Sequence, residues 1–87
     1  MNRIEWTMKA VKQLLKIDTR YVKAIKDSVA ELAEFPLLSL DIKKLQGLEN
    51  QYRIRVGKYR VIFDVVNGEP RIISIKAIKR RTDQTYN

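Results

Sequence analysis

Apolar and polar residues alternate along QYRIRVGKYRVIFDVVNGEPRIISIKAI, residues 51–78. Because successive side chains of a strand point to opposite faces of a sheet, this period predicts strands rather than helices. The pairs Gly57-Lys58 and Asn67-Gly68 interrupt the alternation, and such pairs are typical of turns between antiparallel strands. The segment therefore predicts a three-stranded antiparallel meander over residues 51–56, 59–66 and 71–78.

Helical segments are expected ahead of this meander. Residues 2–6 alternate like a short strand, Thr7 is suited to cap a first helix, and Asp18 or Thr19 to cap a longer second one. The second helix is expected to end before Pro36, which cannot continue it. Each helix has an apolar stripe that predicts its buried side. The stripes are Met8, Val11, Leu14 and Leu15, then Val22, Ile25, Val29, Leu32 and Ala33.

Residues 1–87 are expected to form one α+β domain, in the order short N-terminal strand, two-helix hairpin, connector over residues 37–50, and antiparallel three-stranded meander. The sequence contains neither Cys nor His. This excludes disulfides, thiolate or imidazole metal ligands, and catalytic pairs built on histidine. No apolar run approaches the ~20 residues of a membrane span. The expected protein therefore uses no metal or cofactor, does not enter a membrane, and is cytoplasmic.

The chain is strongly basic, with 18 Lys+Arg against 10 Asp+Glu and a formal net charge of +8. Such a charge favours polyanions, nucleic acid above all, or an acidic protein partner. Six of the eight arginines follow residue 50, whereas seven of the ten lysines precede it. Because the planar guanidinium group binds phosphate in a bidentate manner, the second half of the chain is expected to carry the functional surface.

Strand alternation places cations opposite the apolar residues of the meander. If all the apolar residues face the helices, the other face of the sheet carries Arg53, Arg55, Arg60, Lys76 and Arg80. Like charges on neighbouring strands repel, and a single acid, Asp64, shares the face. The simpler interpretation is an ordinary solvated polar face, which is common in antiparallel sheets. The excess of cations favours a phosphate-binding hollow instead. Tyr86 is an aromatic residue that can stack on a base next to it.

The order of elements and several motifs resemble the RelE toxins of bacterial toxin–antitoxin systems, within the RelE/ParE superfamily. The resemblance covers essentially the whole chain. Its motifs are KLQG at residues 44–47, YRIR at 52–55, GKYRV at 57–61 and KRRTDQTY at 79–86. The combination of Arg60, Arg80 and Tyr86 is typical of the ribonuclease branch. The ParE branch, which inhibits DNA gyrase, generally lacks this combination.

The resemblance implies an mRNA interferase, which is a metal-independent endoribonuclease that enters the A site of the 70S ribosome. It would cleave mRNA through attack by the ribose 2′-hydroxyl. Arg60 and Arg80 would stabilise developing charge, and Tyr86 would act as base or stacking group. The RNA-binding residues would be Arg53, Arg55, Lys76 and Arg81. Arginine cannot readily lose its proton, so Arg53 and Arg55 are assigned no proton transfer. The implied partner is a cognate, acidic, RelB-like antitoxin.

Two other functions are open at this stage. One is a ParE-like toxin that inhibits DNA gyrase by protein binding. The other is a nucleic-acid-binding module without chemistry, which the same basic sheet could support. The nuclease interpretation requires the guanidinium groups of three adjacent strands to share one hollow beside Tyr86.

Overall fold

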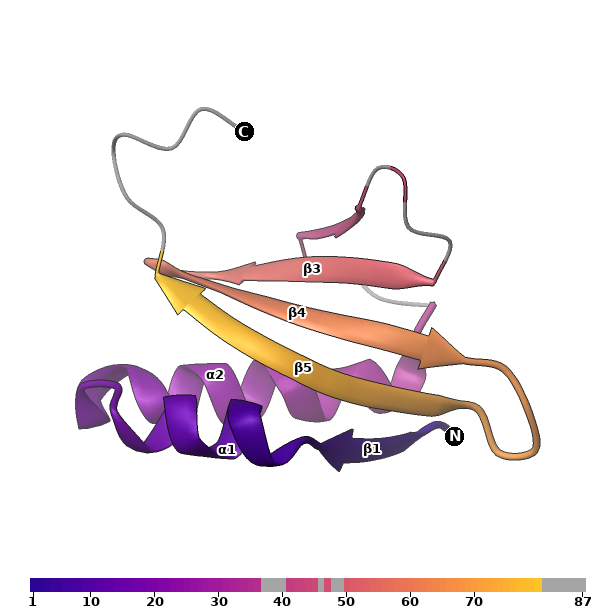
Figure 1. Ribbon diagram of the computed structural model, residues 1–87, viewed down its shortest axis with the longest axis horizontal. Coiled ribbons are helices and arrows are strands. Elements are labelled where there is room, and N and C mark those ends of the chain that lie inside the picture. Colours follow the sequence, from indigo (N-terminus) through magenta and orange to yellow (C-terminus); the bar gives the residue numbers. More distant parts are fainter. Residues whose placement is uncertain (37–40, 46, 48–49, 81–87) are drawn as a thin grey trace.

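A mixed β-sheet with helices on one side forms the body of the molecule (Figure 1). The computed structural model describes residues 1–36, 41–45, 47 and 50–80. The elements in chain order are β1 (Arg3–Trp6), α1 (Met8–Leu15), α2 (Thr19–Glu31), the 3₁₀ turn η1 (Leu32–Glu34), β2 (Ile42–Lys44), β3 (Gln51–Val56), β4 (Tyr59–Val66) and β5 (Ile72–Arg80). Within these described residues the sheet has five strands, in the order β1-β5-β4-β3-β2.

The predicted α+β order is confirmed, but the sheet extends beyond the predicted meander on both sides. β1 pairs in parallel with β5, with Arg3 opposite Ile72. β2 pairs antiparallel with β3 and lies inside the segment that was expected to be a connector. A strand of three residues is too short to show alternation, and it forms because β3 offers its free edge as a pairing partner. The connector prediction was therefore wrong for Ile42–Lys44.

Both helices begin at the predicted capping residues. The Thr7 hydroxyl accepts a hydrogen bond from the backbone N–H of Ala10 at 3.2 Å, and the Asp18 carboxylate accepts one from that of Arg20 at 2.9 Å. α2 continues into η1 and the helical run ends there, before Pro36, as expected.

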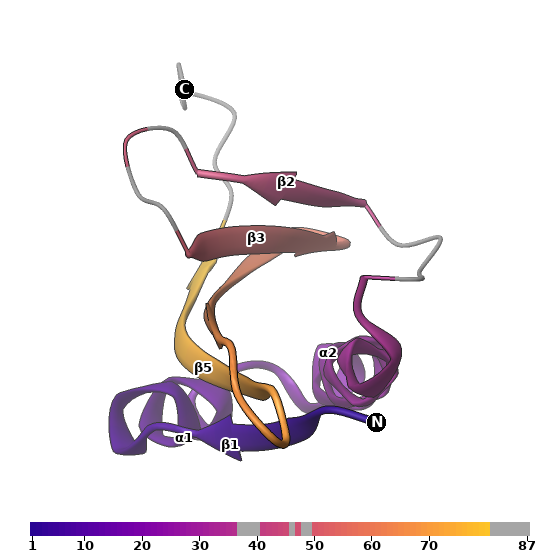
Figure 2. The same ribbon diagram turned by 90° about the vertical axis from the view of Figure 1, so that its right-hand side faces the viewer.

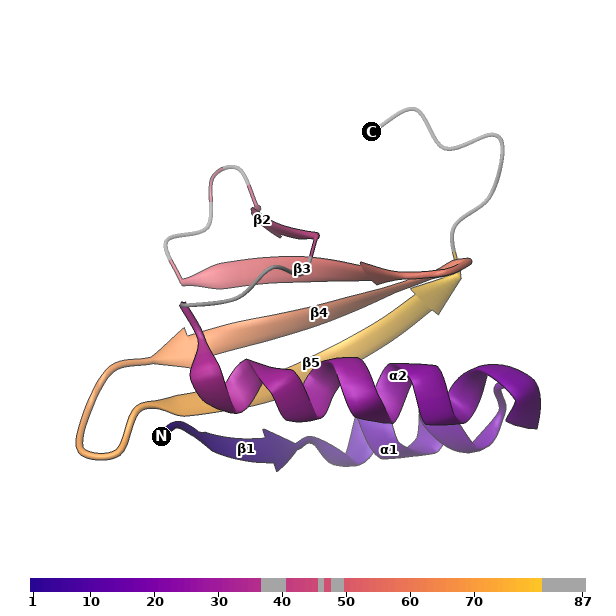
Figure 3. The same ribbon diagram turned by 180° about the vertical axis from the view of Figure 1, so that it is seen from behind.

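The apolar stripe expected on α1 is only partly buried. Leu14 lies in the core, whereas Met8 is 71% exposed and Leu15 is 79% exposed. In chain order α1 follows β1, and Figures 1 and 3 show it lying along the edge of β5. Its apolar residues therefore divide between the core and solvent.

α2 lies across one face of the sheet and builds the core against it (Figures 2 and 3). The largest fully buried side chains are Ile25, Val29 and Leu32 from the α2–η1 segment, with Ile54, Val61, Phe63, Ile73 and Ile75 from the sheet. Phe35, Tyr52 and Phe63 form an aromatic cluster at one end, with ring centroids 5.2 to 6.0 Å apart. The opposite face of the central strands is not covered by α1 or α2, and it carries all the predicted cations except Arg80.

The two predicted hairpins are confirmed, and their loops differ in length. Gly57 and Lys58 form a two-residue loop, because Val56 pairs directly with Tyr59. Gly57 has a φ of +57°, a conformation that glycine adopts without steric cost. The Asn67-Gly68 pair lies in a longer loop over residues 67–71, since the pairing of β4 with β5 ends at Val66 and Ile72.

Candidate nucleic-acid interface

Three cations stand in register across the sheet, next to the β3–β4 turn. Arg55 on β3 lies directly opposite Arg60 on β4, and Arg60 lies directly opposite Lys79 on β5. Residues directly opposite in a sheet place their side chains on the same face. The flanking Ile54, Val61 and Ile78 point into the core, so these three cations point away from it. We call Arg55, Arg60 and Lys79 the cationic row.

A β-bulge in β5 changes the face on which the last residues of that strand lie. Phe63 pairs with Ile75 but Ile62 pairs with Ala77, which leaves Lys76 as an extra residue. Beyond the bulge, Lys79 joins the cationic row, and Arg80 lies opposite Tyr59 on the helix side. The prediction that simple alternation places Arg80 beside Arg60, all on one face, was therefore wrong. Lys79, which sequence reasoning missed, takes that place.

Side chains from α1 and its cap hold the bulge. The Gln13 amide oxygen accepts a hydrogen bond from the backbone N–H of Ile78 at 2.7 Å. The Thr7 hydroxyl donates to the carbonyl oxygen of Ile75 at 2.7 Å. These backbone groups lie where β1 has ended and can no longer pair with β5. The bulge is thus fixed by contacts with residues far away in the sequence, since 65 residues separate Gln13 from Ile78. No local sequence signal reveals it.

Arg53 is a structural cation rather than a free surface group. It is 8% exposed, and its Nη1 donates to the backbone oxygen of Asp41 at 3.2 Å and to the Asp41 carboxylate at 3.3 Å. Arg55 also approaches this carboxylate, with 3.8 Å between Nε and Oδ2. Asp41 therefore ties the segment before β2 to β3 and lies at the β3 end of the cationic row. This arrangement limits Arg53 as an RNA-binding group.

Lys76 lies on the predicted face and pairs with the predicted acid. Its Nζ is 3.6 Å from the Asp64 carboxylate, and the Gln51 side-chain amide donates to the same carboxylate at 2.8 Å. By contrast, among the described residues no carboxylate pairs with Arg60, the centre of the cationic row. Arg60 is therefore the arginine of this face that is best placed to receive an external anion. Arg81 and Tyr86 lie outside the described residues.

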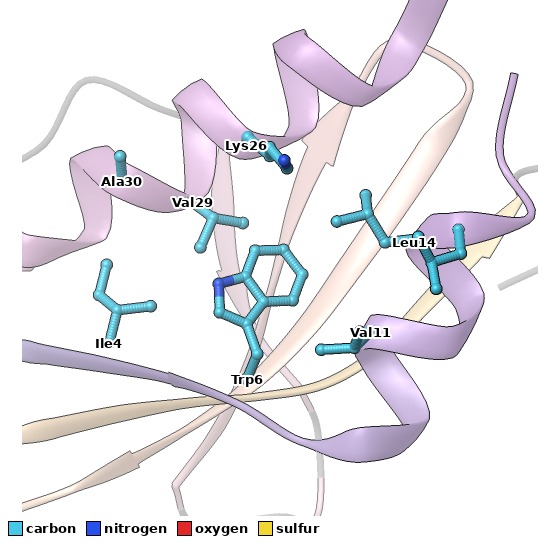
Figure 4. Close-up of a pocket in the computed structure, with 8 residues that line it drawn as sticks. Ile4, Trp6, Val11, Leu14, Lys26, Val29 and Ala30 are labelled. Carbon is cyan, nitrogen blue, oxygen red and sulfur yellow. The ribbon is translucent and has the colours of Figure 1, made fainter. Parts of the chain in front are cut away.

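An apolar groove runs between α1, α2 and β1 on another side of the molecule (Figure 4). It has a volume of about 640 Å³, and the Trp6 indole lies at its centre, between Val11 and Val29. A second hollow of about 500 Å³ adjoins it, and Leu14, Leu15 and Lys26 line both. Leu15, from the exposed part of the α1 stripe, thus forms part of the wall of a continuous apolar surface.

A metal-binding cluster and a membrane-spanning helix are both absent from the described part of the chain. No three carboxylates come together in a group that could hold a metal ion. No helix is long and apolar enough to span a bilayer.

The family is shown by comparison with known proteins. Residues 4–85 match the family described as the ParE toxin of the type II toxin–antitoxin system parDE. The chain belongs to this toxin family, within the RelE/ParE superfamily. A protein of Methanocaldococcus jannaschii that carries the name RelE1 is 35% identical to this toxin over 80 residues, which are 90% of this chain and 88% of the relative.

Solved structures agree with this assignment. The archaeal RelE–RelB complex from Pyrococcus horikoshii contains a chain that is 28% identical, with a TM-score of 0.77 over 94% of this toxin and 97% of that chain. The RelB–RelE complex from Methanococcus jannaschii gives 33% identity and a TM-score of 0.69 over 87% and 88%. The isolated Escherichia coli RelE, at 19% identity and a TM-score of 0.78 over 97% and 88%, shares the fold. The toxin is thus similar to proteins named RelE, although its family model is described as ParE.

Proposed function

We propose that this toxin is a ribosome-dependent endoribonuclease that cleaves mRNA in the A site of the 70S ribosome. The observation that carries the proposal is the cationic row, in which Arg60 lies between Arg55 and Lys79 without a described carboxylate partner. The expected third guanidinium group is replaced by the ammonium group of Lys79, which still places a cation on each of three adjacent strands. Like charges in register destabilise a sheet unless an anion neutralises them, so a phosphate group is a fitting ligand. Similarity to proteins named RelE supports RNA as the source of that phosphate.

The proposed reaction takes its nucleophile from the RNA. The ribose 2′-oxygen attacks the adjacent phosphorus, and the bond from phosphorus to the 5′-oxygen of the next nucleotide breaks. The proton lost by the 2′-hydroxyl is balanced by the proton gained by the departing 5′-oxygen, leaving a 2′,3′-cyclic phosphate and a 5′-hydroxyl. Arg60 stabilises the extra charge on the phosphorane, because a guanidinium group stays protonated throughout. No protein-bound metal takes part in the proposed step.

The remaining residues have supporting roles in this proposal. Arg55 and Lys79 hold flanking phosphates, and Lys76 contacts RNA once RNA competes for its pairing with Asp64. Arg80 was expected to neutralise charge on the leaving side, but it projects from the helix side of the sheet, so Lys79 in the cationic row is the cation of β5 placed to do this. Tyr86 serves as base or stacking group and Arg81 binds RNA.

The proposed partner is an acidic, RelB-like antitoxin. The relatives from Pyrococcus horikoshii and Methanococcus jannaschii are RelE proteins in complex with RelB. The groove in Figure 4 is lined mainly by apolar side chains, as a groove that receives the apolar face of an amphipathic helix would be. Lys26 lines both parts of the groove, and the net charge of the toxin is +8. An antitoxin helix with an apolar stripe and acidic flanks would therefore match this surface in shape and in charge.

Translating ribosomes supplied with the purified toxin test the proposal by toeprinting of the mRNA. The wild type is expected to produce breaks within A-site codons that end in a 5′-hydroxyl. Arg60→Gln is expected to cleave roughly 10²–10³ times more slowly, as for other lost charge contacts in a reaction centre. Arg3→Gln is the matched control, since it removes the same charge from the exposed first residue of β1 and should cleave at the wild-type rate.

The same experiment separates a second candidate function, which the ParE description of the matching family favours. Intact mRNA together with gyrase-dependent DNA damage would contradict the nuclease proposal and support a gyrase inhibitor. RNA binding with neither effect would support a binding module without chemistry.

A further inference from the structure

A second cluster of arginine and aromatic side chains lies at the same end of the sheet, on the helix side. Arg80 is directly opposite Tyr59. The Tyr59 ring contacts that of Tyr21 on α2, with centroids 5.6 Å apart and the planes tilted by 58°. The guanidinium carbon of Arg20 lies 5.6 Å from the centroid of the Tyr21 ring. Guanidinium, ring, ring and guanidinium thus follow one another from the start of α2 to the end of β5.

The cluster is ordered by its own contacts and is still accessible. Asp18 binds the guanidinium of Arg20 through two hydrogen bonds of 2.8 and 3.1 Å, although the Arg20 side chain is 76% exposed. Tyr21 and Tyr59 pack against the core with part of each residue open to solvent. Arg80 is exposed, and no described residue pairs with it. Pre-ordered planar groups of this kind lose little freedom when a ligand binds.

These groups complement the bases of a nucleic acid rather than its phosphates. Unpaired bases stack on aromatic rings and on guanidinium planes. Tyr59 and Arg60 are neighbours in β4 and point to opposite faces of the sheet. The two faces meet at the short β3–β4 turn, which joins these strands at this end of the sheet. One RNA strand that crosses the sheet end can therefore place a phosphate against Arg60 and a neighbouring base against Tyr59.

We propose that Tyr21, Tyr59 and Arg80 form a base-stacking subsite for the RNA nucleotide next to the phosphate bound by Arg60. The inference rests on the proposed function, because it takes single-stranded RNA as the ligand. It also gives the β-bulge of β5 a role: if Lys76 paired with Ile62 in an unbulged strand, every later residue would shift by one position and Arg80 would project from the opposite face.

The experiment measures stacking directly, with the full-length chain and a short 2′-O-methyl RNA that contains 2-aminopurine. This RNA has no free 2′-hydroxyl and cannot be cleaved by the proposed reaction. Stacking of 2-aminopurine quenches its fluorescence, and the anisotropy of an end label gives the affinity. Wild-type toxin is expected to quench. Tyr21→Leu is expected to abolish quenching and weaken binding roughly five- to a hundredfold, whereas Tyr21→Phe keeps both. Arg80→Gln should weaken binding more than the equal-charge control Arg3→Gln.

Circular dichroism and a thermal melt of each variant verify that it is folded before binding is compared. Wild-type quenching by a folded Tyr21→Leu variant would overturn the subsite. So would a loss of affinity with quenching unchanged, because the lost contact would then not be stacking. Failure of the proposed function looks different: quenching would depend on Tyr21 as expected, while mRNA on translating ribosomes stayed intact with the wild type.

Discussion

Replacing Arg60 by glutamine is expected to stabilise the fold at low salt, although most substitutions destabilise a protein. Arg60 lies directly between Arg55 on β3 and Lys79 on β5. Like charges directly opposite each other on neighbouring strands destabilise a sheet, by an amount comparable to the roughly 0.2–1 kcal/mol of other cross-strand pairs. Arg60 takes part in two such pairs, so the loss of its charge relieves both repulsions at once.

The structure sets the magnitude toward the lower end of that range. The Arg55 side chain is 44% exposed and shares its charge with Asp41 at 3.8 Å, so solvent and a counter-charge both weaken the repulsion. A gain of about 0.5–1 kcal/mol is expected for the two pairs together. For a domain of this size, 1 kcal/mol corresponds to roughly 4–8 °C in Tm, so Tm should rise by about 2–8 °C. Glutamine retains part of the arginine stem and its packing.

Thermal and urea unfolding at about 0.01 M and 1 M salt provide the assay, because the Debye length falls from about 30 Å to 3 Å over this range. The gain of Arg60→Gln should be present at low salt and vanish at high salt. Arg60→Lys keeps the charge and should show no gain under either condition. A variant less stable than the wild type at low salt, or a gain that salt does not change, would refute the repulsive row. The case for an anion site there would then fail.

Two other substitutions probe the groove and a helix start. Leu15 lies in the groove wall, and Leu15→Ser should weaken antitoxin binding roughly 10- to 100-fold, which corresponds to the transfer energy of one leucine side chain. Met8 is similarly exposed on α1 but lies outside the groove, so Met8→Ser should leave the affinity unchanged. Equal affinities of the two variants in a titration with the antitoxin would contradict the assignment of the groove. Hydrogen bonds from Arg20 hold the pKa of Asp18 below its usual value, so this carboxylate stabilises the fold above the unfolded pKa and the contribution is lost as the pH falls below about 4. Asp18→Asn should therefore flatten the dependence of Tm on pH in that acid range, and an unchanged slope in melts at a series of pH values would count against it.

The helix starts, the β3–β4–β5 order and the faces of β3 and β4 could all be predicted from short-range patterns. A capping side chain such as Asp18 acts on a backbone N–H two residues away, and the turn at Gly57 depends on its own φ. The side on which Arg55 and Arg60 lie follows from alternation alone, because no bulge interrupts β3 or β4 before them. Two of the three members of the cationic row, Arg55 and Arg60, were therefore predictable without any knowledge of tertiary contacts.

The residues that disagreed with prediction all depend on distant partners. Asp41 approaches Arg53 only after β2 has paired with β3, so alternation could not distinguish a bound arginine from a free one. β2 itself has no detectable pattern, since it exists by pairing with an edge.

The sequence alone determined which segments are helix or strand, with the exception of β2, and that arginines would gather on the uncovered face of a sheet. The three-dimensional packing settled which cations share that face. The side chains of Thr7 and Gln13 form hydrogen bonds with backbone groups of β5 that lie beyond the end of its pairing with β1. The bulge at Lys76 then places Arg80 on the helix side and Lys79 on the open side. A bulge reverses the face on which every later side chain of the strand lies, relative to the face that unbroken alternation predicts. The contacts that decide where the bulge forms come from the other end of the chain.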